Sequence, residues 1–403
     1  MDWKREISVR DLGRAAAAAG LWKLRSLRQA ARKERRPLRL PSFRPRRRAT
    51  GASTPRGAAC RIVGLKIGAS QLAAAHVVNN GSVELVQLAR RPLDRGIVVG
   101  GDLRDPQALV GALRDFFKEN RLPRRDVRLG ISSNRIVVRT FDLADVEGEK
   151  QIENAVRFRA QEVLPVPVDD AVLDYRVLRE EPGTNGTSNC RVLLAAVHRD
   201  FVTRYADACK RAGLRLIGVD LEAFALARAV APVPETGAEA AAAVASIGYD
   251  RTTFAVTDGT TCDFTRVFDW GGASLDREIA RALDLSPSQA EPLKCALRDH
   301  DFDDPAVRET ARAAALEELQ RFARELVASL AYYQNQPRAL PVGEVVVTGG
   351  SSALDGLAEE LERLAGLPVR IADPLEHLRV GKSVRVPDQV GSFAIAIGLG
   401  IES

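Results

Sequence analysis

The sequence contains few of the residues that build metal centres and nucleophilic active sites. Its 403 residues include four histidines and five cysteines. The cysteines are widely spaced, and no two form the C-x-x-C pair that is typical of zinc and redox sites. Scattered thiols are usually small buried side chains of a protein from a reducing compartment. We therefore assign no catalytic residue and no metal ligand.

Long hydrophobic runs are also missing. No apolar run approaches the roughly 20 residues that a membrane-spanning helix needs. The N-terminus is basic, but it lacks the apolar core and the cleavage site of a secretory signal. Aromatic residues make up 5% of the chain, too few to favour base stacking on a nucleic acid. We therefore expect a cytoplasmic protein with no nucleic-acid partner.

The positive charge that is present is concentrated at one end. Residues 1–57 contain 17 Lys and Arg against 4 Asp and Glu, a net charge of +13, whereas the remainder carries 42 against 49, a net charge of −7. Residues 11–36 favour a helix, and residues 37–57 are rich in proline and arginine, as flexible linkers are. Such an arm can lie on an anionic membrane, bind nucleic acid, dock on an acidic partner or stay solvated, although the few aromatic residues do not favour nucleic acid.

The folded body begins near residue 58 with a strand that ends at a glycine. The stretch "VGLKIGAS" (63–70) predicts a strand ending at Gly68, where the backbone can turn close to a ligand. A hairpin turn at Asn80-Gly81 then separates two further strands. The expected elements are strands at Leu72–Val78 and Ser82–Ala89, a helix at Pro106–Asn120 and a strand at Val127–Ser132.

The same plan recurs later in the chain. A strand ends at Ile247-Gly248, Asp258-Gly259 forms a turn, and strands are expected at Thr253–Val256 and Cys262–Phe268. Ile67-Gly68 and Ile247-Gly248 are 180 residues apart, which indicates two similar domains facing each other. The alternative is that any three-stranded meander shows this pattern.

A third glycine turn follows an aliphatic strand at Gly349-Gly350. Ser351 or Ser352 could cap the next helix, which Gly366 would end. The buried face of that helix would carry Leu354, Leu357, Leu361 and Leu364. Glycines allow close approach, and a helix N-terminus offers free N–H donors. Three such turns favour a nucleotide held between two domains.

The three turns resemble the phosphate-1, phosphate-2 and adenosine motifs of the actin-like ATPase superfamily. Within it, the body from about residue 60 resembles the PilM family, the FtsA-like cytoplasmic proteins of type IV pilus assembly. The likeness is carried by "IENAVRFRAQEVLPVPVDDAVLDYRVL" (152–178), "GLRLIGVDLEAFALARAV" (213–230), "FTRVFDWGGASLDREIARALDLSPSQAEPLK" (264–294) and "RELVASLAYYQNQ" (324–336).

The resemblance implies an α/β fold of the actin-like (ribonuclease H-like, duplicated) type with four subdomains beside the N-terminal arm. In 1C, a helix at Gln151–Val163 would end before Pro165 and Pro167, because the residue before a proline avoids helical geometry. The implied bounds are 58–136 with 214–235 and 389–402 for 1A, 137–213 for 1C, 238–273 with 340–388 for 2A, and 274–339 for 2B.

The resemblance also implies a partner and a ligand. Family members bind ATP in the cleft and, in their 1A–1C region, the cytoplasmic tail of a single-pass inner-membrane protein, PilN. Glu291 and Lys294 would face the ribose and base, or would form only an exposed pair one helical turn apart. The implied nucleotide contacts are Lys66, Gly68, Ala69, Ser70, Gln71, Ser246, Gly248, Tyr249, Gly271, Gly272, Glu291, Lys294, Gly349, Gly350 and Ser351.

Two positions depart from the family pattern. Members typically carry an aspartate two residues before each phosphate-motif glycine, where this chain has Lys66 and Ser246. Those aspartates hold hydrated Mg²⁺, whereas a lysine repels a cation and attracts phosphate. Three readings remain open: ATP or ADP binds loosely with little metal dependence, Lys66 replaces the metal's charge, or the cleft is empty.

We therefore expect an adaptor on the cytoplasmic face of a pilus or type II secretion-like platform, peripheral to the inner membrane, that hydrolyses ATP slowly or not at all. An active ATPase or filament-forming FtsA-like protein is the alternative, and sedimentation with nucleotide would distinguish a filament. A sugar or acetate kinase would need a carboxylate base and intact metal positions, and neither motif position is acidic.

Overall fold

A computed structural model describes residues 60–164, 167–183, 187–231, 240–299, 304–352, 354 and 356–402. The helix and linker expected in residues 1–57 lie outside these described residues. The subdomain names 1A, 1C, 2A and 2B are used below for the residue ranges given above. Among the helices of the described part, none is long and apolar enough to cross a membrane.

The first sheet is built on the strand that ends before Gly68. Its first three strands form the expected antiparallel meander. β6 pairs with β1 in parallel, and β10 pairs with β6 in parallel. A short antiparallel hairpin of β4 (Val98–Val99) and β5 (Asp102–Leu103) follows β3 in the chain. The sheet order is β10 (Leu216–Leu221), β6 (Val127–Ile131), β1 (Cys60–Ile67), β2 (Gln71–Asn79), β3 (Val83–Pro92) and β16 (Arg379–Val380).

The second sheet repeats this arrangement. β11, β12 and β13 form an antiparallel meander, and β14 and β15 extend it in parallel from β11. A chance meander would not reproduce the two added parallel strands in the same places, so the predicted duplication is confirmed. The order is β13 (Cys262–Phe268), β12 (Thr252–Thr257), β11 (Ala241–Ile247), β14 (Val342–Thr348) and β15 (Val369–Ile371).

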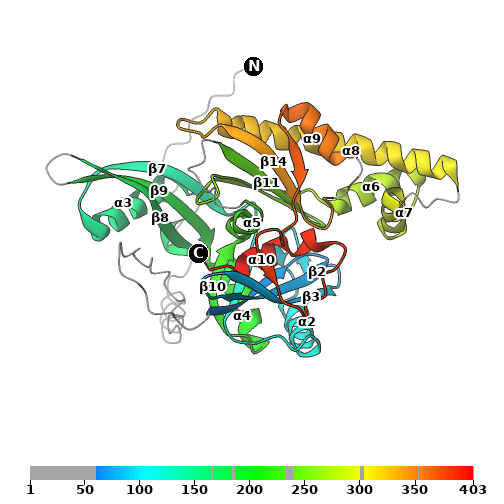
Figure 1. Cartoon of the computed structure of the whole chain (residues 1–403), viewed down its shortest axis with the longest axis horizontal. Helices are drawn as coiled ribbons and strands as arrows, with labels where there is room; N and C mark the ends of the chain where they lie inside the picture. Colours follow the sequence, from blue (N-terminus) through cyan, green and yellow to red (C-terminus); the bar gives the residue numbers. More distant parts are fainter. Residues whose placement is uncertain are drawn as a thin grey trace, which may run out of the picture. The chain divides into compact units, whose positions relative to one another are not determined.

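Two short helices, α5 (Glu222–Val230) and α10 (Ala394–Gly400), lie between the sheets (Figure 1). On one side, Ala396 and Ile397 pack against Ala75 of β2. On the other side, Ala225 and Ile395 share a core with strands of the second sheet. The outer faces are covered by α2 (Pro106–Glu119) and α4 (Arg199–Arg211) on the first sheet, and by α8 (Pro305–Gln334) and α9 (Leu357–Ala365) on the second.

Two insertions complete the body. In 1C, a sheet ordered β7 (Val137–Val146), β9 (Ser188–His198) and β8 (Ala171–Pro182) carries α3 (Gly148–Val163) on one face. As predicted, α3 ends at Val163, although it begins three residues earlier than expected. In 2B, α6 (Gly272–Leu283) and α7 (Pro287–Asp299) pack beside α8. The short helices η1 (Val168–Asp170) and η2 (Val390–Phe393) are the remaining elements.

The expected helix after Gly349-Gly350 starts later than predicted. Neither Ser351 nor Ser352 caps it, because α9 begins at Leu357 after Gly356. The Ser352 hydroxyl instead donates to the Gly349 carbonyl at 2.9 Å, which keeps the chain turning. Among the residues described after the third glycine turn, the first helix N-terminus is therefore that of α9. The predicted end is confirmed, since Gly366 caps α9 with a left-handed backbone.

Two helical glycines test the packing between the sheets. A Cβ on Gly398 of α10 would collide with the Ala225 carbonyl oxygen of α5, whereas a Cβ on Gly111 of α2 meets nothing within 4 Å. Gly398→Ala should lower the free energy of unfolding by at least about 2 kcal/mol. Gly111→Ala should raise it by about 0.5–1 kcal/mol. Urea unfolding measures both, and equal shifts would contradict the close approach of α5 and α10.

Candidate functional site

Two matching turns close the ends of β1 and β11. The Gly68 N–H donates to the Gln71 carbonyl at 2.9 Å, and the Gly248 N–H donates to the Arg251 carbonyl at 2.9 Å. A Cβ on Gly248 would lie 2.8 Å from that carbonyl oxygen, a separation that real Cβ atoms do not adopt. The two turns are thus the same structure, repeated 180 residues apart, and both line one cavity.

That cavity brings together most of the residues that the sequence singled out. Twelve of the fifteen line it: Lys66, Gly68, Ala69, Ser70, Gln71, Ser246, Gly248, Tyr249, Glu291, Lys294, Gly350 and Ser351. Its volume is about 260 Å³, which is below the roughly 300–1,000 Å³ of most ligand pockets. A nucleotide therefore needs the cleft to open further than it does here.

The other three glycines, Gly271, Gly272 and Gly349, pack against the backbone at the end of β11. The Gly272 N–H at the start of α6 donates to the Gly248 carbonyl at 3.0 Å. A Cβ on Gly271 would lie 2.6 Å from the same oxygen, and one on Gly349 would collide with the Ile247 backbone. The N-terminal amide of α6 is thus occupied by the protein's own carbonyl. These glycines permit close backbone packing and are absent from the cavity lining.

Glu291 and Lys294 do not form the exposed pair that was one alternative. Glu291 pairs with Arg95 of the first half, on the loop after β3. Lys294 Nζ lies 2.7 Å from Asp276 Oδ1 of α6 and donates to the Gly272 carbonyl at 3.1 Å. Burial raises the pKa of Asp276, and the adjacent Lys294 ammonium opposes that shift. The two residues of α7 therefore contact different parts of the cleft wall.

Side chains of the phosphate-2 turn cross the cleft. Arg251 donates to the Ser132 carbonyl after β6, and the Gly100 N–H of the β4–β5 hairpin donates to Asp250 Oδ2 at 3.1 Å. The hydroxyls of Ser132 and Thr253 lie 3.2 Å apart. These contacts were not predicted, because a Tyr-Asp-Arg sequence after the glycine does not identify its distant partners. They join the two halves directly.

The residues at the two motif positions do not fit hydrated Mg²⁺, which prefers carboxylate ligands. Lys66 is level with Gly130 in the sheet. Ser246 is level with Thr253 and Thr348. Across the described ranges, no group of three or more His, Cys, Asp or Glu residues could hold a metal ion, and no ion pair involves Lys66 within 4 Å.

One carboxylate that the sequence reasoning missed does line the cavity. Glu222 is 5% exposed and begins α5 directly after β10. A Cβ on Gly130 would lie 3.3 Å from Glu222 Cγ, so the Glu222 side chain lies over the strand position beside Lys66. The position of Glu222 directly after a strand was the sequence feature that could have identified it. A single carboxylate next to a lysine still does not make a Mg²⁺ site.

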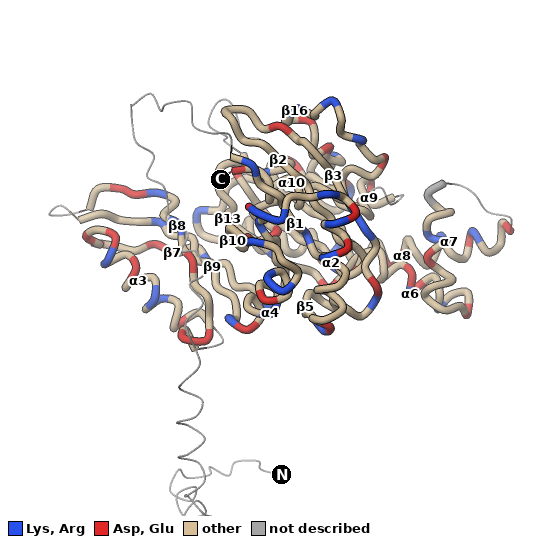
Figure 2. Tube along the Cα trace, turned by 90° about the horizontal axis from the view of Figure 1, so that it is seen from below, with Lys and Arg blue, Asp and Glu red and all other residues tan. Residues whose placement is uncertain are grey.

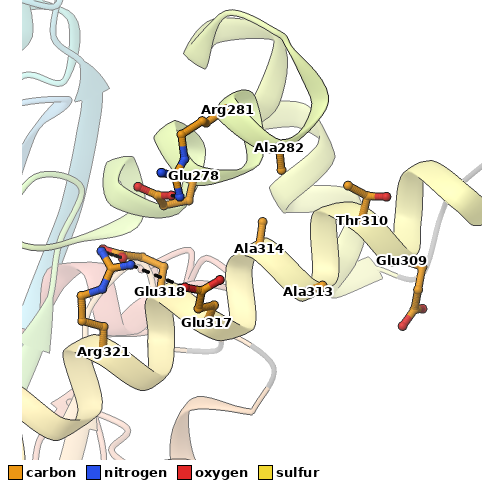
Figure 3. A pocket seen from close by; sticks show the side chains of 10 residues that line it. All are labelled: Glu278, Arg281, Ala282, Glu309, Thr310, Ala313, Ala314, Glu317, Glu318 and Arg321. Carbon is orange, nitrogen blue, oxygen red and sulfur yellow. Dashed lines mark ion pairs between the residues drawn. The ribbon is translucent and has the colours of Figure 1, made fainter.

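A larger groove of about 580 Å³ lies elsewhere, between α6 and α8 (Figure 3). Most of its charged side chains pair with one another: Arg321 lies 2.6 Å from Glu318, and Arg281 pairs with Glu278. Alanines such as Ala282, Ala313 and Ala314 line the space between them. None of the predicted nucleotide contacts lines this groove, so the cleft remains the better candidate site despite its smaller volume.

The chain is similar to proteins of pilus assembly and cell division. Residues 64–403 match the family described as type IV pilus assembly protein PilM. The cell division protein FtsA of Escherichia coli K12 is 27% identical over 383 residues, which cover 84% of this chain and 89% of FtsA. FtsA of Pseudomonas aeruginosa is also 27% identical, over 365 residues that cover 81% and 86%.

A solved structure, a PilM–PilN type IV pilus biogenesis complex, superimposes with a TM-score of 0.70. It is 26% identical, and the match covers 86% of this chain and 98% of that one. Together these similarities confirm the predicted α/β actin-like fold.

The buried Lys294–Asp276 pair gives a test of the cleft wall. Lys294→Met would leave the Asp276 carboxylate buried without its cation, and should cost about 3 kcal/mol of unfolding free energy at neutral pH. Because the pKa of Asp276 is raised, its ionised form is unfavourable, so this loss should shrink as pH falls and the carboxyl becomes neutral. Urea unfolding across pH measures it.

The control is the double variant Lys294→Met with Asp276→Leu, which removes both charges and should recover most of the loss. A single variant as stable as the parent chain at neutral pH would contradict the pairing.

Proposed function

This chain belongs to the PilM family of type IV pilus assembly proteins, and we propose that it acts as an actin-like adaptor at the cytoplasmic face of a pilus or type II secretion-like platform. The observation that carries this proposal is the match to the family over residues 64–403. The altered motif positions, Lys66 and Ser246, support a role in assembly over one in phosphoryl transfer.

The partner we propose is the cytoplasmic tail of a PilN-like single-pass inner-membrane protein, bound in the 1A–1C region. The similarity to a PilM that was solved in complex with PilN supports this choice. In 1C, α3 presents Phe158 with 63% of its surface exposed, between Arg157 and Arg159. Figure 2 shows charges of both signs along α3. An exposed aromatic among charges suits an anchor for a short peptide.

For the cleft we propose loose binding of ATP or ADP with slow or no hydrolysis. The convergence of both glycine turns on one cavity supports binding. The small size of that cavity supports low affinity in the closed form, because opening it costs free energy. The missing carboxylates support the absence of efficient hydrolysis.

A tail-binding measurement tests the proposed partner. A fluorescently labelled peptide with the sequence of the cytoplasmic tail of a PilN-like protein from the same organism should bind the full chain. Phe158→Ala should weaken binding about tenfold, as loss of an interface anchor does. Tyr332→Ala, on α8 of 2B and equally exposed at 63%, should leave it unchanged.

Equal effects of the two substitutions would place the tail elsewhere. No binding of the peptide by the folded parent chain would contradict the adaptor proposal itself.

For residues 1–57 we propose that the net charge of +13 holds the chain near an anionic membrane. Full-length protein should co-sediment with anionic liposomes, and a truncation to 58–403 should not, because each basic residue near such a surface contributes about 1 kcal/mol. Neutral liposomes are the control. The same binding by both proteins would contradict the idea.

A further inference from the structure

The charges that line the cleft are not balanced. Besides Lys66 and Lys294, the cations Arg90 and Arg251 line the cavity. The acidic side chains there are already engaged: Asp250 accepts the Gly100 N–H, and Glu291 pairs with Arg95. Among the lining carboxylates that the structure describes, only Glu222 has no such contact. Two of the cations also face carboxylates, since Lys294 lies 2.7 Å from Asp276 and Arg251 lies 3.7 Å from Asp250. This leaves Lys66 and Arg90 against Glu222, so the charge that remains is positive.

The phosphate-2 side of the cleft offers hydroxyls where a metal site needs carboxylates. Ser246 is 3% exposed and lies beside Thr253 in the sheet, and both residues line the cavity. Hydroxyls can donate hydrogen bonds to phosphate oxygens, but they do not replace the negative charge that a hydrated Mg²⁺ needs nearby. This half of the cleft is suited to an anion and unsuited to a cation.

Arg251 supplies a positive charge deep in the cleft. It ends the turn that matches Gly68–Gln71, so it is the counterpart of Gln71 in the other half. Its side chain is only 9% exposed and crosses to the Ser132 carbonyl. Within the described part of the chain, its Nε has no hydrogen-bond partner, although Asp250 Oδ1 lies 3.7 Å away. A donor in this state is satisfied by an anion.

A clasp of side chains closes the 2B end of the cleft. It consists of the Arg95–Glu291 ion pair and the ring of Tyr249, whose centre lies 5.5 Å from the Arg95 guanidinium and 6.0 Å from Lys294 Nζ. Arg95 comes from 1A, whereas Glu291 comes from 2B. Both paired side chains are about half exposed, at 51% and 43%. Such pairs contribute little free energy, so this clasp can open.

We propose that the cleft is a metal-independent site for a phosphate-bearing anion, in which Lys66 and Arg251 carry the positive charge and the Arg95–Glu291 clasp must open for entry. This refines the loose nucleotide binding proposed above and rests on it. The anion can be a nucleotide or a free polyphosphate, since the phosphate chemistry is shared. Mg²⁺ plays no part, because the residues do not fit it and it would compete with the two cations for phosphate charge.

Calorimetric titration of the full chain tests the metal independence. ATP and inorganic triphosphate would each be titrated in excess Mg²⁺ and in EDTA. We expect ATP to bind in EDTA at least as tightly as in Mg²⁺, and Lys66→Gln to weaken it about tenfold, as loss of one close charge does. Equal affinity for triphosphate would identify the polyphosphate as the recognised part, and weaker binding would add a contribution from the base.

Binding that requires Mg²⁺ would overturn the proposal, and so would the absence of binding in both buffers. The adaptor function is judged separately, by the tail peptide, so either failure leaves it standing.

The clasp is tested by two substitutions that change charge in opposite directions. Arg95→Gln and Glu291→Gln both break the ion pair, so both should raise the association rate of ATP about two- to fivefold, the range that an exposed pair permits. Charge alone would make Arg95→Gln slower and Glu291→Gln faster. Changes of the association rate in opposite directions would therefore contradict the proposal that the Arg95–Glu291 pair must open for entry.

Asp126→Asn is the control for these two substitutions. It breaks the Arg215–Asp126 pair, which is similarly exposed at 66% and 48% and does not line the cavity. The association rate should not change.

Discussion

The close packing of α5 and α10 between the two sheets determines where everything else in this protein lies. A Cβ on Gly64 would collide with the Ala396 carbonyl oxygen, and one on Gly400 would lie 2.5 Å from Val77 Cγ2. Because α10 approaches the first sheet so closely, and α5 shares a core with the second, the ends of β1 and β11 face a common space. The two glycine turns meet there as a consequence of helix packing.

The two turns share a backbone arrangement, but their side chains differ. Both turns keep the same hydrogen bond from glycine to the third following residue. The side chains at the strand ends, however, are a lysine and a serine, and the second turn carries a tyrosine, an aspartate and an arginine across the cleft. Protein side chains therefore make the contacts between the halves. In the adaptor role proposed above, these contacts would hold the closed form without hydrolysis.

Local patterns predicted the strands and the duplication, whereas the resemblance to the PilM family implied the set of residues of which most meet in the cavity. Strand ends marked by glycine are local signals, and Ile67-Gly68 and Ile247-Gly248 repeat them at matched positions. The predicted start of α9 was wrong. A serine such as Ser352 can cap a helix, but its hydroxyl can equally donate a hydrogen bond to a preceding carbonyl, here that of Gly349.

Long-range polar contacts could not be predicted. Arg95 and Glu291 are 196 residues apart, and nothing in either neighbourhood indicates the other. Asp276 was missed for a related reason: its position on a helix of alternating charges is typical of an exposed residue, and only the fold buries it against Lys294.

The central claim is that Lys66 and Ser246 remove the need for Mg²⁺, and the most direct test introduces aspartates at both positions. In the double variant Lys66→Asp with Ser246→Asp, Glu222 would join two new carboxylates around the cavity. The measurement is the ratio of ATP affinities in Mg²⁺ and in EDTA, for this variant and for the parent chain. The account predicts a ratio near one or below for the parent, and at least about tenfold tighter binding in Mg²⁺ for the variant. Tighter ATP binding in Mg²⁺ than in EDTA by the parent chain, together with the same ratio in the variant, would contradict the account.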